Sequence, residues 1–345
     1  MKQLVTKPLS VIVLMHHECV PPRSLKGHGN KEAQIWRTEY DVMKTLTRIG
    51  HEVHAVGISN DLRVIRRAAR RHKPQIAFNL LEEFAGHPLY DQHVVSYLEL
   101  IRMPYTGCNP LGLTLARDKA LTKKILAYHN IHVPRFVVFP PKWKVRRPRR
   151  LKFPLIVKSL VEEGSIGIAH ASIVRDDEKL AERVQFLHEQ TGKSVLVEGY
   201  IEGREIYVGV IGNGKLQAYP PWELLLKDLP EGAPNIATYK VKWDVNYQKR
   251  VGVVTQAADL AEEMKKKMTR LSKRIYRLLA LSGYARIDYR LNADGRIYVL
   301  EVNPNPQIAR GEDFADSAAK VSVRYEQLLQ KILMLGLSYD PLSRI

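Results

Sequence analysis

The sequence predicts an α/β protein with α+β lobes, in which a lobe built on a parallel sheet precedes two lobes rich in antiparallel strands. In the first third of the 345 residues, apolar runs of strand length alternate with helical patterns. This alternation is typical of a parallel sheet with right-handed crossovers. After residue 153, short strand patterns dominate. The last two of them are joined through Asp294-Gly295, a strong signal for an antiparallel hairpin.

The first lobe is expected to alternate strands with helices, because each apolar run is followed by apolar residues at helical spacing. We expect strands at residues 9–15, 51–58 and 74–81, and helices at 35–49, 61–71 and 92–101. A helix at 115–129 and an extended segment at 133–139 then lead into a basic linker.

The rest of the chain is expected to consist mainly of strands. We expect them at residues 155–158, 168–173, 194–200, 205–211, 215–219, 284–291 and 297–302. Helices are expected at 179–190, 260–282 and 318–335, the last of them ending at Gly336. The length allows more than one core. We therefore divide the chain into an N-terminal lobe at 1–115, a central lobe at 116–200 and a C-terminal lobe at 201–345.

The formal net charge is +18, and Lys and Arg are densest near residues 66–73, 142–150 and 265–274. Clustered cations can bind nucleic acid by neutralising its phosphates. These runs lie in separate segments, however, and no spacing of a known nucleic-acid-binding motif accompanies them. We therefore expect solvated faces and a field that attracts small anions, and we do not expect nucleic acid as a partner.

The chain carries no signal for a membrane or an oxidising compartment. It has no apolar run of about 18 residues or more, and no small-residue cleavage site follows its first apolar run. Cys19 and Cys108 lack the spacing of a metal site or a disulfide framework. A soluble, cytoplasmic protein without membrane contact is expected.

The strongest chemical signal lies in the last hairpin. Arg286 and Asp288 alternate on one strand, and Glu301 and Asn303 alternate on its partner. Each pair projects from one face of its strand, so the four side chains can converge if the strands pair through the Asp-Gly turn. Two carboxylates and an amide oxygen suit Mg²⁺, which proteins usually hold with a few carboxylates and substrate phosphates. The arginine would then face phosphate.

A surface hairpin with solvated or paired charges is the alternative interpretation. Glu301 argues against it, because this residue lies within the otherwise apolar run 298–304. A carboxylate in such surroundings needs a partner or a metal.

Two further segments add weaker signals. A buried strand ends in Lys158 and is followed by the glycine-rich loop 163–167, which contains the candidate catalytic residue Ser165. Such a loop lets backbone N–H groups approach phosphates, although a lysine at a strand end often only snorkels and glycines often mark ordinary turns. Glu198 and Glu205 lie at the ends of a strand-turn-strand segment, where they could bracket adenine and ribose.

Together these segments resemble the ATP-grasp superfamily, and within it the D-alanine:D-alanine ligase-like branch. The resemblance covers roughly residues 77–306. Before the hairpin, the motifs that carry it are Phe78-Asn79-Leu80-Leu81-Glu82, Pro104-Tyr105-Thr106-Gly107 and Asp118-Lys119-Ala120-Leu121-Thr122-Lys123. The resemblance implies an ATP-grasp fold that clamps ATP between two antiparallel sheets of the central and C-terminal lobes.

The resemblance also implies roles for individual residues. Glu198 would meet the adenine amino group, the backbone near Tyr200 and Ile201 would meet the ring edge, and Glu205 would hold the ribose hydroxyls. The phosphates would be contacted by Lys119 and Lys158. Two Mg²⁺ ions, for which Mn²⁺ is an alternative, would be bound by Asp288, Glu301 and Asn303. Lys242 would close on the γ-phosphate, and Arg286 would stabilise the transferred phosphoryl group and the tetrahedral intermediate.

This machinery suits a ligase that activates a carboxylate as an acyl phosphate and passes it to an amine, because the attack on the γ-phosphate requires charge neutralisation. Acyl phosphates hydrolyse, so we expect lids at 163–167 and 230–247. The expected partners are small, amino-acid-like carboxylate and amine substrates, and the resemblance implies a homodimer through the N-terminal lobe.

The segments with which the family binds its two substrates are not matched in this sequence. Where the family has a glycine-rich segment with a glutamate and serines, this chain has His16-His17-Glu18. Where the family has a Pro-Gly turn and serines, it has Asn305-Pro306-Gln307 followed by Arg310, whose side chain could anchor a carboxylate or simply be exposed. We therefore expect a different acid and a different amine, which the sequence does not identify. The alternatives are D-alanine:D-alanine ligase itself and an ATP-binding module without ligase turnover.

Overall fold

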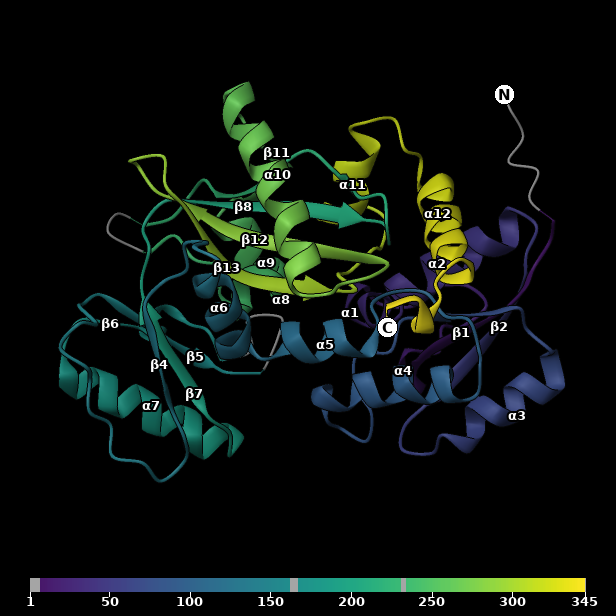
Figure 1. Ribbon diagram of the computed structural model, residues 1–345, viewed down its shortest axis with the longest axis horizontal. Helices are drawn as coiled ribbons and strands as arrows, with labels where there is room; N and C mark the ends of the chain where they lie inside the picture. Colours follow the sequence, from purple (N-terminus) through teal and green to yellow (C-terminus); the bar gives the residue numbers. More distant parts are fainter. Residues whose placement is uncertain (1–6, 162–166, 231–233, 345) are drawn as a thin grey trace.

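The computed structural model describes residues 7–161, 167–230 and 234–344, and these residues form three sheets (Figure 1). The N-terminal sheet is parallel, as predicted, with the strand order β2-β1-β3. Its central strand is buried on both faces, which explains the unbroken apolar run at Val11 to Met15. The elements of this lobe are β1 (Ser10–His16), α1 (Asn30–Ile35), α2 (Arg37–Arg48), β2 (Glu52–Ile58), α3 (Arg63–His72), β3 (Ile76–Asn79) and α4 (Asp91–Leu100).

The single helix predicted at 115–129 is wrong. Two helices, α5 (Pro110–Arg117) and α6 (Lys119–Tyr128), meet at Asp118. The carboxylate of Asp118 accepts hydrogen bonds from the N–H groups of Ala120 and Leu121, both at 2.9 Å. An aspartate at this position caps a new helix, and the cap places Lys119 in the first turn of α6.

The central sheet is antiparallel with the order β4-β7-β5-β6, and α7 packs against it. Its elements are β4 (Phe136–Phe139), β5 (Leu155–Ser159), β6 (Ile173–Val174), α7 (Asp177–Thr191) and β7 (Val195–Gly199). The strand predicted at 168–173 is wrong except at its last residue, because the chain forms a short 3-10 helix at His170–Ser172.

The C-terminal sheet is also antiparallel, with the main order β11-β10-β8-β12-β13. Its strands are β8 (Arg204–Ile211), β9 (Gln217–Ala218), β10 (Trp222–Leu226), β11 (Val253–Ala257), β12 (Tyr284–Leu291) and β13 (Ile297–Pro304). Two of them, β10 and β11, were not predicted. The helix α10 (Glu262–Leu278) packs on one face of this sheet through Met268 and Ile275, and the short helices α8 (Tyr239–Trp243) and α9 (Val245–Arg250) occupy part of the expected lid.

The end of the chain returns to the N-terminal lobe (Figure 1). The predicted helix at 318–335 is replaced by α11 (Asp313–Ala319) and α12 (Tyr325–Leu337), and α12 packs against α2 and β3. Gly336 lies inside α12 and does not end it. Glycine is required there because a Cβ would stand 2.4 Å from the carbonyl oxygen of Tyr105. None of the described helices is long and apolar enough to cross a membrane.

Candidate active site

The central and C-terminal sheets contribute side chains to one open cavity. Charged side chains from both sheets line it together with aliphatic groups. Eight of the residues singled out from the sequence lie in its lining: Lys158, Glu198, Tyr200, Ile201, Glu205, Lys242, Asp288 and Glu301. Ser165 lies outside the described residues, so its predicted role stays a prediction.

The hairpin of β12 and β13 brings its four polar side chains together, which confirms the predicted convergence. Arg286 stands opposite Asn303, and Asp288 stands opposite Glu301. Arg286 donates from Nε and NH2 to the two carboxylate oxygens of Asp288, at 2.8 and 2.9 Å. Asn303 donates from Nδ2 to Oδ2 of the same carboxylate at 2.9 Å.

A β-bulge lies inside this hairpin. Asp288 pairs with Glu301, but the next residue of β12, Tyr289, pairs with Val299, so Leu300 is the extra residue. Bulges beside functional sites redirect neighbouring side chains. The carbonyl oxygen of Leu300 accepts a hydrogen bond at 2.7 Å from Nζ of Lys123, a residue of α6.

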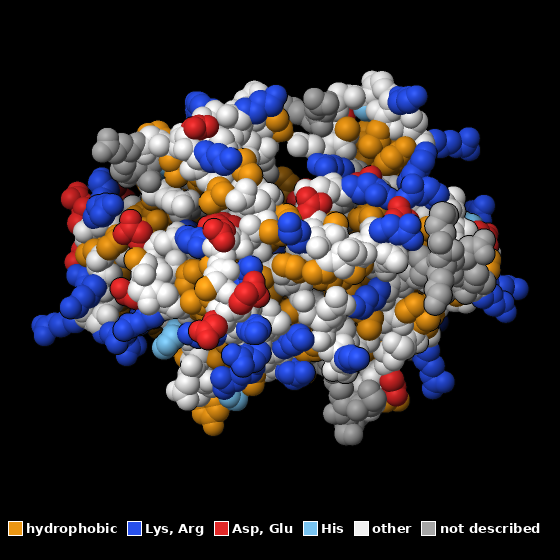
Figure 2. Space-filling view, turned by 90° about the horizontal axis from the view of Figure 1, so that it is seen from above, with side chains coloured by type: hydrophobic (Ala, Val, Ile, Leu, Met, Phe, Trp, Pro, Cys, Tyr) orange, Lys and Arg blue, Asp and Glu red, His pale blue; other side chains and the backbone are white. Residues whose placement is uncertain are grey.

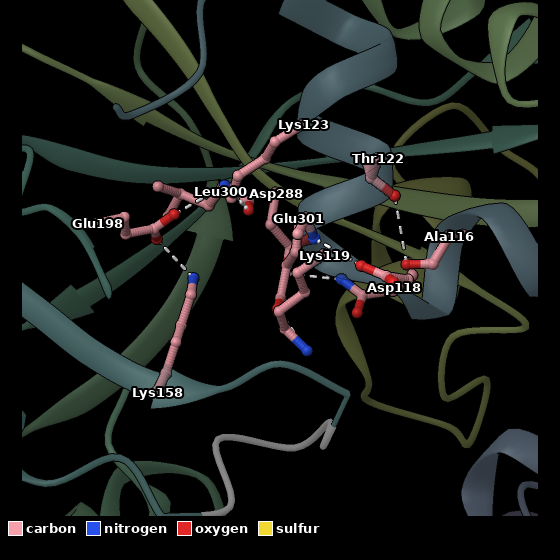
Figure 3. A network of polar contacts seen from close by, with 12 residues as sticks. Ala116, Asp118, Lys119, Thr122, Lys123, Lys158, Glu198, Asp288, Leu300 and Glu301 are labelled. Atoms are coloured by element: carbon pink, nitrogen blue, oxygen red, sulfur yellow. Dashed lines mark hydrogen bonds and ion pairs between the residues drawn. The ribbon is translucent and has the colours of Figure 1, made fainter. Parts of the chain in front are cut away.

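Glu198 lies between two buried lysines (Figure 3). Nζ of Lys158 is 2.6 Å from Oε1 of Glu198, and Nζ of Lys123 is 3.0 Å from Oε2. The contact with Lys123 is an ion pair that is not aligned as a hydrogen bond, so the buried Oε2 has no aligned donor. Burial lowers the pKa of Lys123 to about 8, against the attraction of Glu198.

Lys123 belongs to the motif at residues 118–123, but no role was predicted for it. It follows Lys119 by four residues on one helix, so both lie on the same helical face. This spacing was the available signal for a second functional lysine. Arg290 was also missed; its NH2 donates to Glu205 at 2.7 Å, and the hydroxyl of Tyr207 donates to the same carboxylate at 2.8 Å.

Two further lysines act on the hairpin carboxylates. Nζ of Lys119 lies 3.9 Å from Oε2 of Glu301 (Figure 3), and Lys242 belongs to α8 at the cavity wall. Burial alone would raise the pKa of Glu301, but Lys119 and then Lys242 lower it to about 2. Burial raises the pKa of Asp288 to about 6, and the guanidinium of Arg286 opposes this rise. Glu301 is therefore an anion at neutral pH.

The donor set fits a hard divalent cation that arrives with phosphate. Asp288 and Glu301 offer carboxylate oxygens, and Asn303 offers an amide oxygen, which are ligand types that Mg²⁺ prefers. Within the described ranges, no group of three or more His, Cys, Asp and Glu could hold a metal ion. A metal held by these three side chains would need further ligands, and phosphate oxygens are suited to that place.

The cavity also fits a purine nucleotide. Among the described residues, Oε2 of Glu198 is contacted only by the ammonium of Lys123 at 3.0 Å, and a carboxylate oxygen can accept a second hydrogen bond, such as one from an exocyclic amino group. The N–H of Tyr200 is already donated to the carbonyl oxygen of Pro154 at 3.0 Å. The N–H of Ile201 has no such acceptor among the described residues, so it is the backbone donor available for the edge of a base.

Arg310 does not face the cavity residues. Its NH2 lies 3.1 Å from both Thr45 Oγ1 and Glu326 Oε1, and its guanidinium stacks over the ring of Tyr325 at 4.2 Å. These contacts tie the segment after β13 to α2 and α12. Arg310 is therefore a structural residue here, and the alternative that it anchors a substrate carboxylate is disfavoured.

Sequence comparison finds a match to the family model described as D-ala D-ala ligase C-terminus over residues 124–334. A D-alanine–D-alanine ligase of Syntrophotalea carbinolica is 30% identical over 317 residues, which cover 90% of this chain and 93% of that protein. The ligase of the same name from Carboxydothermus hydrogenoformans is 29% identical over 90% of this chain and 96% of its own length. Among solved structures, the D-alanine–D-alanine ligase of Bacillus anthracis complexed with ATP superposes with a TM-score of 0.74 at 23% identity, covering 95% of this chain and 97% of that one. This similarity shows a common fold.

Proposed function

Because this chain belongs to the D-ala D-ala ligase family, it is an ATP-dependent ligase that forms a C–N bond, and we propose that the hairpin of β12 and β13 is where it makes an acyl phosphate. The ATP-grasp fold predicted from the sequence is confirmed by the same comparisons. The observation that carries the proposal is the meeting of Arg286, Asp288, Asn303 and Glu301 opposite the lysines of the cavity.

The proposed reaction has two steps. A carboxylate oxygen of the first substrate attacks the γ-phosphorus of ATP, and the bond to the ADP oxygen breaks. The amine nitrogen then attacks the acyl carbon, phosphate leaves, and the nitrogen loses its proton. Both steps concentrate negative charge at the transferred phosphoryl group or the tetrahedral carbon, which fixed positive groups stabilise.

We assign the polar residues of the cavity to these steps. Glu198 and the N–H of Ile201 would bind adenine, and Glu205, held by Arg290, would bind the ribose hydroxyls. The phosphates would be bound by Lys119, Lys158 and Lys242. Arg286, which forms the end of the polar row on β12, would stabilise the charge that develops on the phosphoryl group and the intermediate.

The metal would be bound by Asp288, Glu301 and Asn303, and we propose two Mg²⁺ ions, with Mn²⁺ as the alternative. When bound, the metal neutralises phosphate charge and polarises the γ-phosphoryl group. The ionised state of Glu301 supports this assignment, because metal ligands must be deprotonated.

We also propose three lobes at residues 1–115, 116–200 and 201–345, supported by the one sheet that each of them contains. A cytoplasmic location and a homodimer through the N-terminal lobe are proposed from the resemblance of the sequence. Gel filtration with light scattering tests the dimer, since a monomer at micromolar concentration would contradict it.

The test of the function measures ADP and phosphate released from Mg·ATP with a panel of carboxylic acids and amines, including D-alanine as acid and as amine because the named relatives are D-alanine–D-alanine ligases. Turnover that needs one acid and one amine, and that falls at least about 100-fold in Glu301→Gln, supports the proposal. Glu263→Gln is the matched control, because Glu263 is exposed on α10. Nucleotide binding without turnover on any pair would contradict it.

A further inference from the structure

The polar row on β12 ends at Arg286, and this arginine borders a second, narrow pocket. Residues of β8, β10, β12 and α11 line that pocket, and none of them also lines the nucleotide cavity. Asp288 lines the cavity and Arg286 lines the pocket, so the hydrogen-bonded pair of these two side chains stands between the two spaces. Arg286 can therefore be approached from a side that the nucleotide does not occupy.

Gly209 allows α11 to come close to this end of the sheet. It stands opposite Arg286 in the pairing of β8 with β12, so no side chain covers the sheet beside the arginine. A Cβ at Gly209 would lie 2.9 Å from the ring of Phe314, which is too close to be tolerated. The buried ring of Phe314 takes this place, and the residue before it, Asp313, is thereby held beside the guanidinium.

Arg286 has one nitrogen left for a ligand. Its Nε and NH2 both donate to Asp288, whereas NH1 faces Oδ2 of Asp313 at 3.9 Å. That distance is too long for a hydrogen bond. The side chains of Arg286 and Asp313 are each 16% exposed, so a small molecule can reach an N–H donor and a carboxylate oxygen that lie side by side.

The carboxylate of Asp313 is not needed to neutralise Arg286, because Asp288 already forms a bidentate pair with this guanidinium. The chain has a net charge of +18, and its Lys and Arg side chains are spread over the face shown in Figure 2. Among the described residues, nevertheless, Asp313 forms an ion pair with Arg286 alone. Its oxygens therefore remain available to accept a proton or a hydrogen bond from a ligand.

A buried donor in the lining of the same pocket also lacks a partner. Trp222 is 9% exposed and pairs with Tyr207, which in turn pairs with Asp288, so these side chains lie on the sheet face that carries Arg286. Within the described residues, Nε1 of Trp222 has no acceptor. Buried N–H groups normally have one, so this donor indicates a polar group from outside the chain.

The second step of the proposed reaction needs a donor and an acceptor placed side by side. When a neutral amine attacks the acyl carbon, the carbonyl oxygen becomes negative and the nitrogen becomes positive, and both atoms are bonded to the same carbon. NH1 of Arg286 can donate to the oxygen while Oδ2 of Asp313 accepts from the nitrogen.

We infer that Asp313 is the general base that accepts the proton of the attacking amine. The nitrogen gives its lone pair to the new C–N bond and loses one proton to Asp313. The C–O bond to phosphate then breaks, and its electron pair leaves with the phosphate. The proton passes through solvent to the phosphate, which restores the anion of Asp313. The inference rests on the proposed function, because it assigns a residue to the second of its two steps.

The test separates the two steps by the choice of nucleophile. Hydroxylamine is uncharged at neutral pH and traps an acyl phosphate without a catalytic base, giving a hydroxamate and phosphate. The other nucleophile is the amine that supports turnover in the panel, with D-alanine as the first probe. Asp313→Asn should lower kcat with the amine at least about 100-fold and keep hydroxamate formation within about threefold of the wild type. Asp316→Asn is the matched control, because it removes a carboxylate of the same helix that does not line the pocket.

The outcomes distinguish this inference from the proposed function. Loss of the hydroxamate together with amine turnover in Asp313→Asn, at wild-type affinity for nucleotide, would overturn the inference, because Asp313 would then act in activation. Unchanged amine turnover, or equal losses in the Asp313 and Asp316 variants, would also overturn it. If Asp313→Asn does not bind nucleotide, Asp313→Ser is measured in its place. A wild type that forms no hydroxamate from any acid would contradict the proposed function itself, and the inference with it.

Discussion

Replacing Lys123 with methionine should impair catalysis far more than stability. The substitution keeps the length of the side chain and removes its ammonium. Two contacts are lost, the ion pair with Glu198 at 3.0 Å and the hydrogen bond to the carbonyl oxygen of Leu300 at 2.7 Å. Each contributes about 1.5–3 kcal/mol, as is usual for hydrogen bonds and pairs of charged groups.

An opposing effect of similar size is removed by the same change. The pKa of Lys123 is lowered from 10.5 to about 8 because the cost of burying its charge exceeds the attraction of Glu198, so loss of the buried charge offsets loss of the two contacts. The free energy of unfolding should therefore change by less than about 2 kcal/mol, as is common when a buried charge gives way to an apolar side chain of similar volume.

The catalytic effect should be larger because Lys123 fixes the bulge that precedes Glu301. Without it, the carbonyl of Leu300 loses its donor, and Glu198 is held by Lys158 alone. A displacement of about 1 Å at a catalytic group costs about 100-fold in rate, so kcat/KM for ATP should fall about 100-fold or more. Urea unfolding and steady-state ADP release measure the two quantities, with the exposed neighbour Lys124→Met as control. Wild-type activity would refute the positioning role, and a loss of stability above about 4 kcal/mol would show that Lys123 is chiefly structural.

Three further substitutions test the local structure and its pH dependence. Asp118→Ala removes the cap of α6 and should lower the unfolding free energy by about 1 kcal/mol, while raising KM for ATP through Lys119; a wild-type thermal midpoint and KM would contradict this. Gly336→Ala should destabilise the protein by about 1–3 kcal/mol in urea unfolding despite the helix preference of alanine, because its Cβ meets the Tyr105 carbonyl. Burial raises the pKa of Glu39 from 4.5 to about 7, so the folded state holds a proton that the unfolded state releases, and wild-type stability falls as the pH rises through this window. Glu39→Gln should therefore match the wild type near pH 4.5 and be more stable by up to about 3 kcal/mol at pH 8, and equal stability at both pH values would contradict the burial of an unpaired carboxyl.

The sequence was sufficient at the last hairpin, where local chemistry decides the structure. The alternation of Arg286 with Asp288 and of Glu301 with Asn303, together with the Asp-Gly turn, predicted the convergence of the hairpin, because strand period and turn type are local properties. The bulge at Leu300 could not be read in this way. It depends on Lys123, whose helix lies far away in the sequence and reaches the hairpin only in the folded chain.

Contacts between segments that are distant in the sequence explain several of the wrong or missing predictions. The strand β11 pairs only with β10 at the edge of its sheet and is partly exposed, so it lacks the apolar run that marks a buried strand. The predicted helix end at Gly336 is wrong because it rests on the tendency of glycine to stop helices, whereas the close contact with Tyr105 requires glycine at this position. No role was predicted for Arg290, because its partner Glu205 lies beside it only through the pairing of β12 with β8.

The distribution of charge gives a physical reason why the anionic complex of metal and nucleotide binds beside the hairpin. In and around the cavity there are five cations, namely Lys119, Lys123, Lys158, Lys242 and Arg286, and they exceed the four carboxylates of Glu198, Asp288, Glu301 and Asp313. The ion pair of Glu205 with Arg290 adds no net charge. The excess is positive, so the anionic complex of metal and nucleotide is attracted to the side where the hairpin lies.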